Sequence, residues 1–176
     1  KNCTEMAIMY YAASKVGTVP VPLNYRLADQ EWAYIINDSE AKLIIVKGNE
    51  YSDRINQISS DLKNVKKYIS ISLDNSIEKF QDFYDWLSDS SNEKPTLKIH
   101  ENDDVYQMYT SGTTGHPKGA VLLQRNVAAN IRQYLNSLTL PRPSRTLLVA
   151  PMYNAAAMIN MCLSLIHISE PTRPDE

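Results

Sequence analysis

Hydroxyl side chains, glycines and a lysine are concentrated in one short stretch, Tyr109 to Gly119, which reads YTSGTTGHPKG. Glycine lets backbone N–H groups approach an anion closely, hydroxyls donate hydrogen bonds, and lysine supplies a positive charge. The whole chain has only five glycines, and three of them lie in this stretch. We therefore interpret it as a phosphate-binding loop. The candidate phosphate-binding residues are Thr110, Ser111, Gly112, Thr113, Thr114, Gly115 and Lys118.

The stretch differs from two common nucleotide-binding motifs. The phosphate loop of strand–loop–helix nucleotidases has glycine directly before its lysine and a serine or threonine directly after it. Here Pro117 precedes Lys118 and Gly119 follows it, so the hydroxyl that would bind magnesium is missing. The dinucleotide fingerprint GxGxxG does not occur. A plain surface turn is the alternative, but the full order of hydroxyls, glycines, proline and lysine favours phosphate binding.

Two apolar runs flank this loop and must hold it. Residues 105–109 and 120–123 are predicted strands, and apolar residues from Val127 to Leu138 then follow helical spacing. Residues 146–150 are a further predicted strand, which leads into the motif APMYN at 150–154. Within that motif, Asn154 is equally consistent with a turn or helix cap and with a place in a substrate pocket.

Helices and strands alternate in the rest of the chain, which predicts an α/β fold with β-sheets covered by helices. The first expected elements are a helix that begins by residue 4 and is ended by Gly17, an extended stretch over 18–23, and a helix over 29–37 with Asp29 as its N-cap. A strand over 41–46, a helix over 50–62, a strand over 68–73 and an amphipathic helix over 76–87 are expected to follow.

Composition excludes several classes of protein. Lys and Arg total 18 against 20 Asp and Glu, a balance that argues against a nucleic-acid-binding surface. No apolar run is long enough to cross a bilayer. The chain has only two cysteines, which fits a reducing, cytoplasmic setting rather than a disulfide scaffold. No metal site is expected, because the cysteines and histidines lack metal-ligand spacing: Cys3, Cys162, His100, His116 and His167.

The stretch 109–119 resembles the signature of the adenylate-forming (AMP-binding) enzymes, which include acyl- and aryl-CoA synthetases, luciferases and the adenylation domains of peptide synthetases. Residues 12–27 and 31–46 are also similar to this family, and PLNYRL at 22–27 is closer to the CoA synthetases than to peptide-synthetase domains. APMYN resembles the family's proline–aromatic motif near the carboxylate substrate. The departures are Gln107, where the family usually has an apolar residue, and Asn154, where histidine is common.

The resemblance implies an activity. In this family the loop grips the β- and γ-phosphates of ATP while a carboxylate attacks the α-phosphate. An acyl-adenylate and pyrophosphate result, and coenzyme A then takes the acyl group as a thioester. ATP, Mg²⁺, coenzyme A and a small-molecule carboxylate are thus the implied cofactors and partners, with Tyr153 and Asn154 as candidate pocket residues. The alternatives are a peptide-synthetase adenylation domain and a non-catalytic nucleotide-binding relic.

The same resemblance implies a partial N-terminal domain over residues 1–162 that is incomplete at both ends. Residues 163–176 resemble a translated sequencing adapter, and we expect them to be a non-native tail. The family's catalytic lysine and its glutamate-bearing adenine motif lie outside this sequence, as do the remainder of the N-terminal domain and the C-terminal domain. We therefore expect a cytoplasmic enzyme, at a membrane surface if its acid is long, whose 176-residue fragment is inactive alone.

Overall fold

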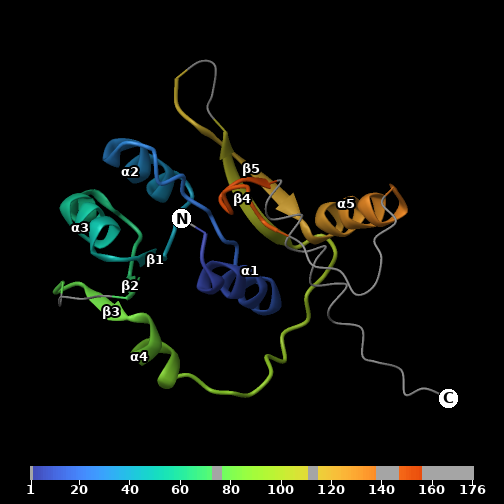
Figure 1. Cartoon of the computed structure of the whole chain (residues 1–176), viewed down its shortest axis with the longest axis horizontal. Helices are drawn as coiled ribbons and strands as arrows, with labels where there is room; N and C mark the ends of the chain where they lie inside the picture. The colour runs from blue at the N-terminus through green and yellow to red at the C-terminus, as the bar shows by residue number, and fades with distance from the viewer. Residues whose placement is uncertain (1, 73–76, 111–114, 138–146, 156–176) are drawn as a thin grey trace. The chain divides into compact units, whose positions relative to one another are not determined.

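A computed structural model describes residues 2–72, 77–110, 115–137 and 147–155 (Figure 1). The packing of the chain divides it into two units. Unit 1 comprises Lys1–Pro22, Pro95–Thr110 and Ala120–Glu176, and unit 2 comprises Leu23–Lys94 and Ser111–Gly119. Residues 156–176 lie outside the described part, so the expected domain end at 162 and the non-native tail remain predictions.

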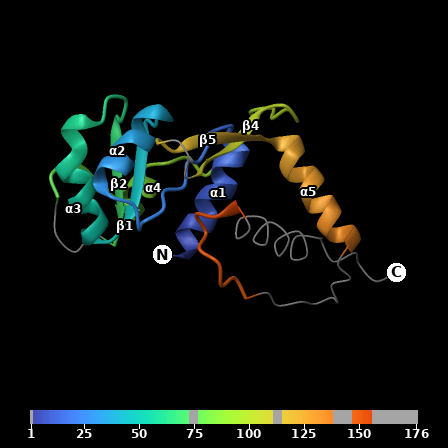
Figure 2. The same ribbon diagram turned by 90° about the horizontal axis from the view of Figure 1, so that it is seen from above.

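Unit 2 is built on a parallel sheet of three strands in the order β1-β2-β3. The strands are β1 (Leu43–Lys47), β2 (Lys67–Ile71) and β3 (Phe80–Asp82). Its helices are α2 (Asp29–Asp38), α3 (Asn49–Ile58) and α4 (Phe83–Ser88), with a 3₁₀ turn at Ser59–Asp61. Helix α3 packs against β1 and α2, and α4 packs against β2 (Figures 1 and 2). This sheet covered by helices confirms the expected α/β class.

The core of unit 2 combines apolar packing with one buried polar pair. Trp32 and Ile36 of α2 meet Ile44 of β1, Ile55 of α3 and Phe80 of β3. Trp32 and Ile36 therefore lie on the buried face of α2. Two fully buried serines, Ser52 and Ser70, accompany this core, and their hydroxyl oxygens lie 2.8 Å apart. The Ser52 hydroxyl also contacts the Gly48 carbonyl within hydrogen-bonding distance. Each buried hydroxyl therefore has a partner, as burial requires.

Arg54 of α3 fixes the chain that leads into α2. Its guanidinium donates to the Asp29 carboxylate at 2.7 Å and to the carbonyls of Leu27 and Tyr25 at 2.7 and 3.2 Å. The same group lies 3.8 Å from the centre of the Trp32 ring. A planar guanidinium can make these contacts at once because its donors point in fixed directions.

The expected role of Asp29 as an N-cap is wrong. Helix α2 begins at Asp29, its N-cap is Ala28, and the Ala28 N–H donates to the Glu31 carboxylate at 2.9 Å. The Asp29 carboxylate bonds Arg54 instead. An ion pair with a residue on another helix has displaced the local cap that the sequence favoured.

The expected amphipathic helix over 76–87 is also wrong in part. Phe80–Asp82 form β3, with Phe80 paired to Tyr68 of β2, and helix α4 begins only at Phe83. Asp82 is the N-cap of α4 and accepts from the N–H groups of Tyr84 and Asp85. Pairing with a strand distant in sequence has overridden helical spacing.

Unit 1 contains α1 (Thr4–Val16), β4 (Asp104–Thr110), most of β5 (Lys118–Leu123) and α5 (Gln124–Ser137), with β4 and β5 paired. Helix α1 ends at Gly17, as expected, with φ of +68° in the left-handed region. The expected strand over 146–150 is wrong for the described residues 147–150, which form no strand. Leu147 and Val149 there are 85% and 81% exposed.

The core of unit 1 brings together three separate pieces of chain. Tyr10 of α1, Val105 and Tyr106 of β4, and Met152 are all buried and in one cluster. The rings of Tyr10 and Tyr106 meet edge to face with centres 5.2 Å apart. In the part of the chain that the structure describes, no helix has the length and apolar character to cross a membrane.

The contacts of Arg54 generate a stability prediction. We expect Arg54→Lys to lower the free energy of unfolding by about 1–2 kcal/mol, because lysine keeps the charge but cannot reach the two carbonyls and the carboxylate together. Urea unfolding followed by circular dichroism measures this. Arg125→Lys, at an exposed position of α5, is the matched control and should change stability by less than about 0.5 kcal/mol. Equal effects of the two substitutions would contradict the prediction.

Candidate functional site

The predicted phosphate loop connects two paired strands. Thr110 is the last residue of β4 and Lys118 is the first residue of β5, and both are exposed. The strand–loop–strand arrangement expected from the sequence is therefore confirmed, and it differs from the strand–loop–helix of the common nucleotidase loop. Ser111, Gly112, Thr113 and Thr114 lie outside the described residues, so their role in binding phosphate remains a prediction.

The second half of the loop has a backbone that requires glycine and a ring contact that the sequence did not predict. Gly115 has φ of +127°, a conformation that side-chain-bearing residues rarely adopt. The exposed imidazole of His116 stacks on Tyr34 of α2, with ring centres 4.6 Å apart and planes 17° apart. His116 is thus exposed to solvent, and its ring links the loop to α2.

Gln107, which departs from the family pattern, is accommodated within unit 1. Its side-chain N–H donates to the Tyr109 hydroxyl at 3.2 Å, and its backbone N–H donates to the Pro20 carbonyl at 3.2 Å. The amide thus has a hydrogen-bond partner on its own strand. The extended segment 18–23 is connected to β4 by the second bond.

The candidate substrate residues lie in a turn of unit 1. The backbone N–H of Asn154 donates to the Pro151 carbonyl at 2.9 Å, which closes the turn. Tyr153 is half-buried and Asn154 is exposed, next to the buried Met152. The turn expected as one reading of Asn154 is present. Its place in a substrate pocket remains a prediction.

Two residues near the start of the chain hold the backbone just before this turn. Asn2 donates to the Ala150 carbonyl at 2.9 Å and accepts from the Met152 N–H at 2.8 Å. Tyr10 donates from its hydroxyl to the Met152 carbonyl at 2.9 Å. We call Asn2 and Tyr10 together the N-terminal clasp. Sequence reasoning missed it, because no local pattern connects residues about 150 positions apart.

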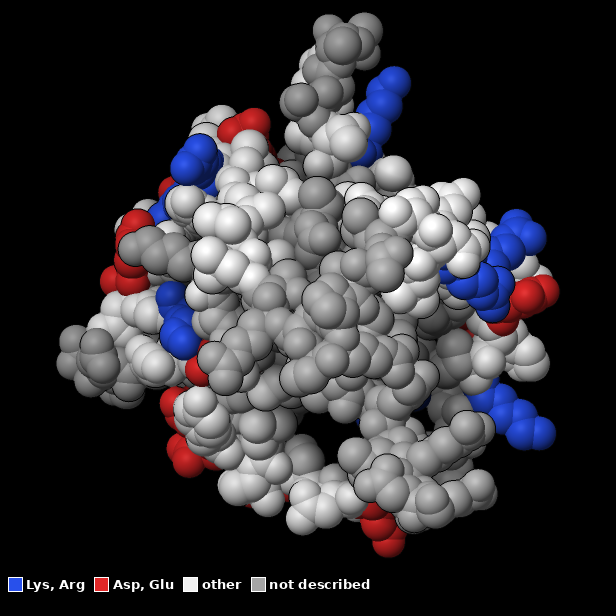
Figure 3. Space-filling model, turned by 45° about the vertical axis from the view of Figure 1, so that its right-hand side comes forward, with Lys and Arg blue, Asp and Glu red and all other residues white. Residues whose placement is uncertain are grey.

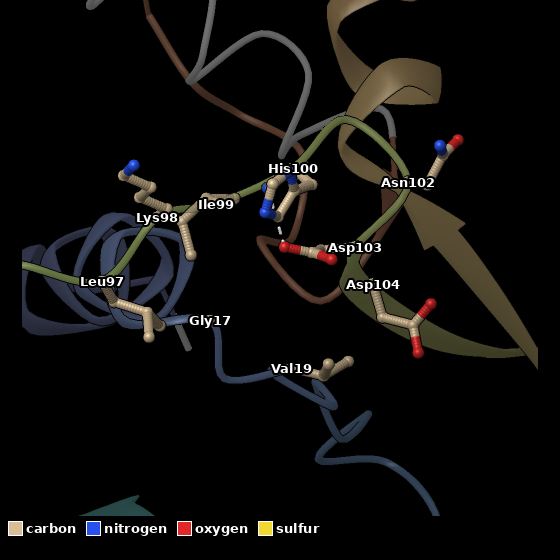
Figure 4. Close-up of a pocket in the computed structure, with 9 residues that line it drawn as sticks. All are labelled: Gly17, Val19, Leu97, Lys98, Ile99, His100, Asn102, Asp103 and Asp104. Carbon is tan, nitrogen blue, oxygen red and sulfur yellow. Dashed lines mark hydrogen bonds between the residues drawn. The ribbon is translucent and has the colours of Figure 1, made fainter.

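A cavity of about 560 Å³ lies elsewhere in unit 1, between the end of α1 and the approach to β4 (Figure 4). One wall is apolar and the other carries polar groups. Among the polar groups is the Asp103 carboxylate, which accepts a hydrogen bond from the backbone N–H of His100 at 2.8 Å. None of the predicted site residues lines this cavity. The lining of the cavity includes Val19, Leu97, Ile99, His100, Asp103 and Asp104.

In Figure 3, both basic side chains (blue) and acidic side chains (red) are visible, mainly along the edges of the view. Among the described residues, no group of three or more histidines, cysteines or acids has the arrangement to hold a metal ion. An anion at the predicted loop would therefore depend on backbone N–H groups, hydroxyls and Lys118.

The profile of the AMP-binding enzyme family matches residues 1–169 of this chain. The chain belongs to this family. Long-chain-fatty-acid–CoA ligase FadD13 of Mycobacterium tuberculosis is 30% identical over 165 residues, which cover 93% of this chain and 31% of that protein. Crotonobetaine/carnitine–CoA ligase of Proteus mirabilis is 29% identical over 130 residues, or 72% of this chain and 25% of that ligase.

A solved structure supports the same assignment. The inhibitor-bound crystal structure of the N-terminal domain of FACL13 from Mycobacterium tuberculosis matches with a TM-score of 0.80 and 28% identity, covering 94% of this chain and 40% of that one. The expected resemblance to the N-terminal part of this family is thereby confirmed. This AMP-binding chain spans less than a third of the length of the two ligases above.

The buried hydroxyl of Tyr10 generates a pH prediction. Burial and the neighbouring Tyr106 raise the pKa of Tyr10 well above its ordinary value of 10.0. The stability that comes from neutral Tyr10 is therefore complete below pH 10 and is lost as pH rises toward the folded-state pKa. Above pH 10 we expect wild type to lose about 1.4 kcal/mol per pH unit more than Tyr10→Phe does.

Urea unfolding between pH 9 and pH 11.5 measures this difference. Burial also raises the pKa of Tyr68, but both proteins carry Tyr68, so its effect cancels in the comparison. Parallel stability curves for wild type and Tyr10→Phe would show that the prediction is wrong.

Proposed function

We propose that this chain is the ATP-binding N-terminal part of an AMP-forming acid–CoA ligase. The enzyme activates a carboxylic acid as an acyl-adenylate and transfers it to coenzyme A. The observation that carries this proposal is the sequence YTSGTTGHPKG, held between β4 and β5 in a chain of the AMP-binding family. The family uses ATP, and the loop offers the donors that a triphosphate needs.

The loop residues have distinct roles in this proposal. Backbone N–H groups and hydroxyls of 110–115 bind the β- and γ-phosphates, and Lys118 neutralises charge at the other end of the loop. Gly115 supports this assignment because a residue without a Cβ lets the backbone approach an anion closely. The described residues contain no cluster of carboxylates that could hold Mg²⁺ by themselves, so in this proposal Mg²⁺ binds together with the nucleotide.

The names of the relatives favour coenzyme A as the acceptor. FadD13 is described as a ligase of long-chain fatty acids and CoA, and the Proteus relative as a ligase of crotonobetaine or carnitine and CoA. Both names state a CoA ligase, which supports coenzyme A over the carrier protein of a peptide synthetase. The acids differ between them, so we propose a carboxylic acid as the substrate class, with Tyr153 and Asn154 near its carboxylate. The cytoplasmic setting remains a prediction.

A comparison of nucleotides with three, two and one phosphates tests the nucleotide site. We expect the chain to bind ATP more tightly than ADP and ADP more tightly than AMP, because the loop contacts the β- and γ-phosphates. Lys118→Ala should raise the dissociation constant for ATP by about tenfold, the effect of losing one charge-assisted hydrogen bond, and leave the constant for AMP nearly unchanged. Isothermal titration calorimetry at fixed ionic strength measures each dissociation constant.

Lys66→Ala, at an exposed lysine of unit 2, is the matched control for removing one positive charge. The dissociation constants of this variant for ATP, ADP and AMP should equal those of wild type, because Lys66 lies outside the loop. Equal affinities for ATP and AMP in wild type, or equal losses in both variants, would exclude the proposed phosphate contacts.

A second prediction concerns chemistry. We expect the 176-residue chain to show no carboxylate-dependent exchange of pyrophosphate into ATP, because its sequence lacks the family's catalytic lysine and acidic magnesium ligand. Radiolabelled pyrophosphate with decanoate as the acid tests this. Exchange by the chain that Lys118→Ala abolishes would contradict the expectation and assign catalysis to residues already present.

A further inference from the structure

The N-terminal clasp acts on the three residues before the candidate substrate residues. Asn2 bonds the carbonyl of Ala150 and the N–H of Met152, and Tyr10 bonds the carbonyl of Met152. Three backbone polar groups within three residues are thus bound by side chains of one distant segment. The next two residues are Tyr153 and Asn154, the candidate pocket residues.

The side-chain amide of Asn2 imitates a neighbouring strand. A strand partner bonds the carbonyl of one residue and the N–H of the residue two positions on, and Asn2 makes this pair of contacts with a single side chain. Met152 is 4% exposed, so its backbone is anchored by packing as well as by hydrogen bonds. The entry to the turn therefore has little freedom.

The far side of the turn is closed by its own backbone. The Asn154 N–H donates to the Pro151 carbonyl, and proline at 151 fixes its own φ. Tyr153 and Asn154 consequently follow a segment whose carbonyls and N–H groups are bound on both sides. Groups that recognise a ligand discriminate best when such contacts hold them in advance.

A second asparagine makes the same contact where no substrate role is proposed. Asn37 of α2 donates to the Asp61 carbonyl at 2.9 Å and accepts from the Lys63 N–H at 2.9 Å. The two asparagines thus share one bonding pattern, an acceptor and a donor two residues apart. Asn37 lies in unit 2, whereas the N-terminal clasp lies in unit 1, so Asn37 is a matched control.

We propose that Asn2 and Tyr10 are positioning residues for recognition of the carboxylic acid. They fix the backbone of Ala150–Met152 so that Tyr153 and Asn154 are held ready for the acid. The inference rests on the proposed function and deepens it, because it assigns acid affinity, and not nucleotide affinity, to contacts made by the first ten residues. Neither residue touches the acid itself.

The first experiment measures the clasp directly in the 176-residue chain. Amide hydrogen exchange, read residue by residue by NMR, should be roughly tenfold faster at Met152 in Asn2→Ala than in wild type. Asn2→Asp keeps the acceptor for this N–H and should restore most of the protection. Asn37→Ala should accelerate exchange at Lys63 and leave Met152 unchanged. Wild-type protection at Met152 in Asn2→Ala would overturn the inference.

The second experiment separates acid from nucleotide. With decanoate as the probe, Asn2→Ala and Tyr10→Phe should each raise the dissociation constant at least about fivefold, while ATP binds as in wild type to within about twofold. Asn37→Ala should change neither constant. A structural role alone would weaken both ligands together, and that result would overturn the inference.

Two further outcomes separate this inference from the proposed function. Unchanged decanoate affinity in both clasp variants, or no decanoate binding by wild type, overturns the positioning role while ATP is still preferred over AMP. If wild type binds ATP no more tightly than AMP, the proposed function fails. The hydrogen-exchange result at Met152 would still measure the clasp by itself.

Discussion

The core of unit 1 is centred on Tyr10, whose buried hydroxyl donates a hydrogen bond to the Met152 carbonyl. A buried hydroxyl needs a partner, and Tyr10 finds it 142 positions along the chain. Tyr106 of β4 packs edge to face against the same ring. One tyrosine thus joins α1, the strand before the phosphate loop and the segment before the candidate substrate turn. The Tyr10 side chain is therefore covered by Tyr106 on one strand and by the backbone of Met152 in a separate segment.

Both units use polar side chains to bind irregular backbone. Asn2 and Asn37 each bridge a carbonyl and an N–H two residues apart, and Arg54 gathers two carbonyls and a carboxylate. Segments outside helices and strands have backbone groups that no ladder pairs. Such side chains give these segments a fixed path, and in unit 1 the segment held in this way leads directly into the candidate substrate turn.

Local features of this chain could be predicted from its sequence. The phosphate loop, the strands on either side of it and the stop at Gly17 depend on residues close together, and the structure has each strand and the stop where expected. Two of the errors came from distant partners. The Asp29 carboxylate pairs with Arg54 and is not the N-cap of α2 that the sequence predicts. Pairing with Tyr68 places Phe80 in a strand instead of a helix. The N-terminal clasp was missed for the same reason, since its partners lie at opposite ends of the described chain.

The discontinuous make-up of unit 1 has a consequence for the newly made chain. A ribosome releases residues 23–94 of unit 2 well before Met152 exists, so most of that parallel sheet can form while unit 1 is unfinished. Tyr10 and the apolar residues of α1 beside it must then wait, at roughly 5–20 residues per second, on the order of ten seconds for their partner. During that interval the first helix has an unburied apolar face. The speed of synthesis therefore sets how long this apolar face stays unburied.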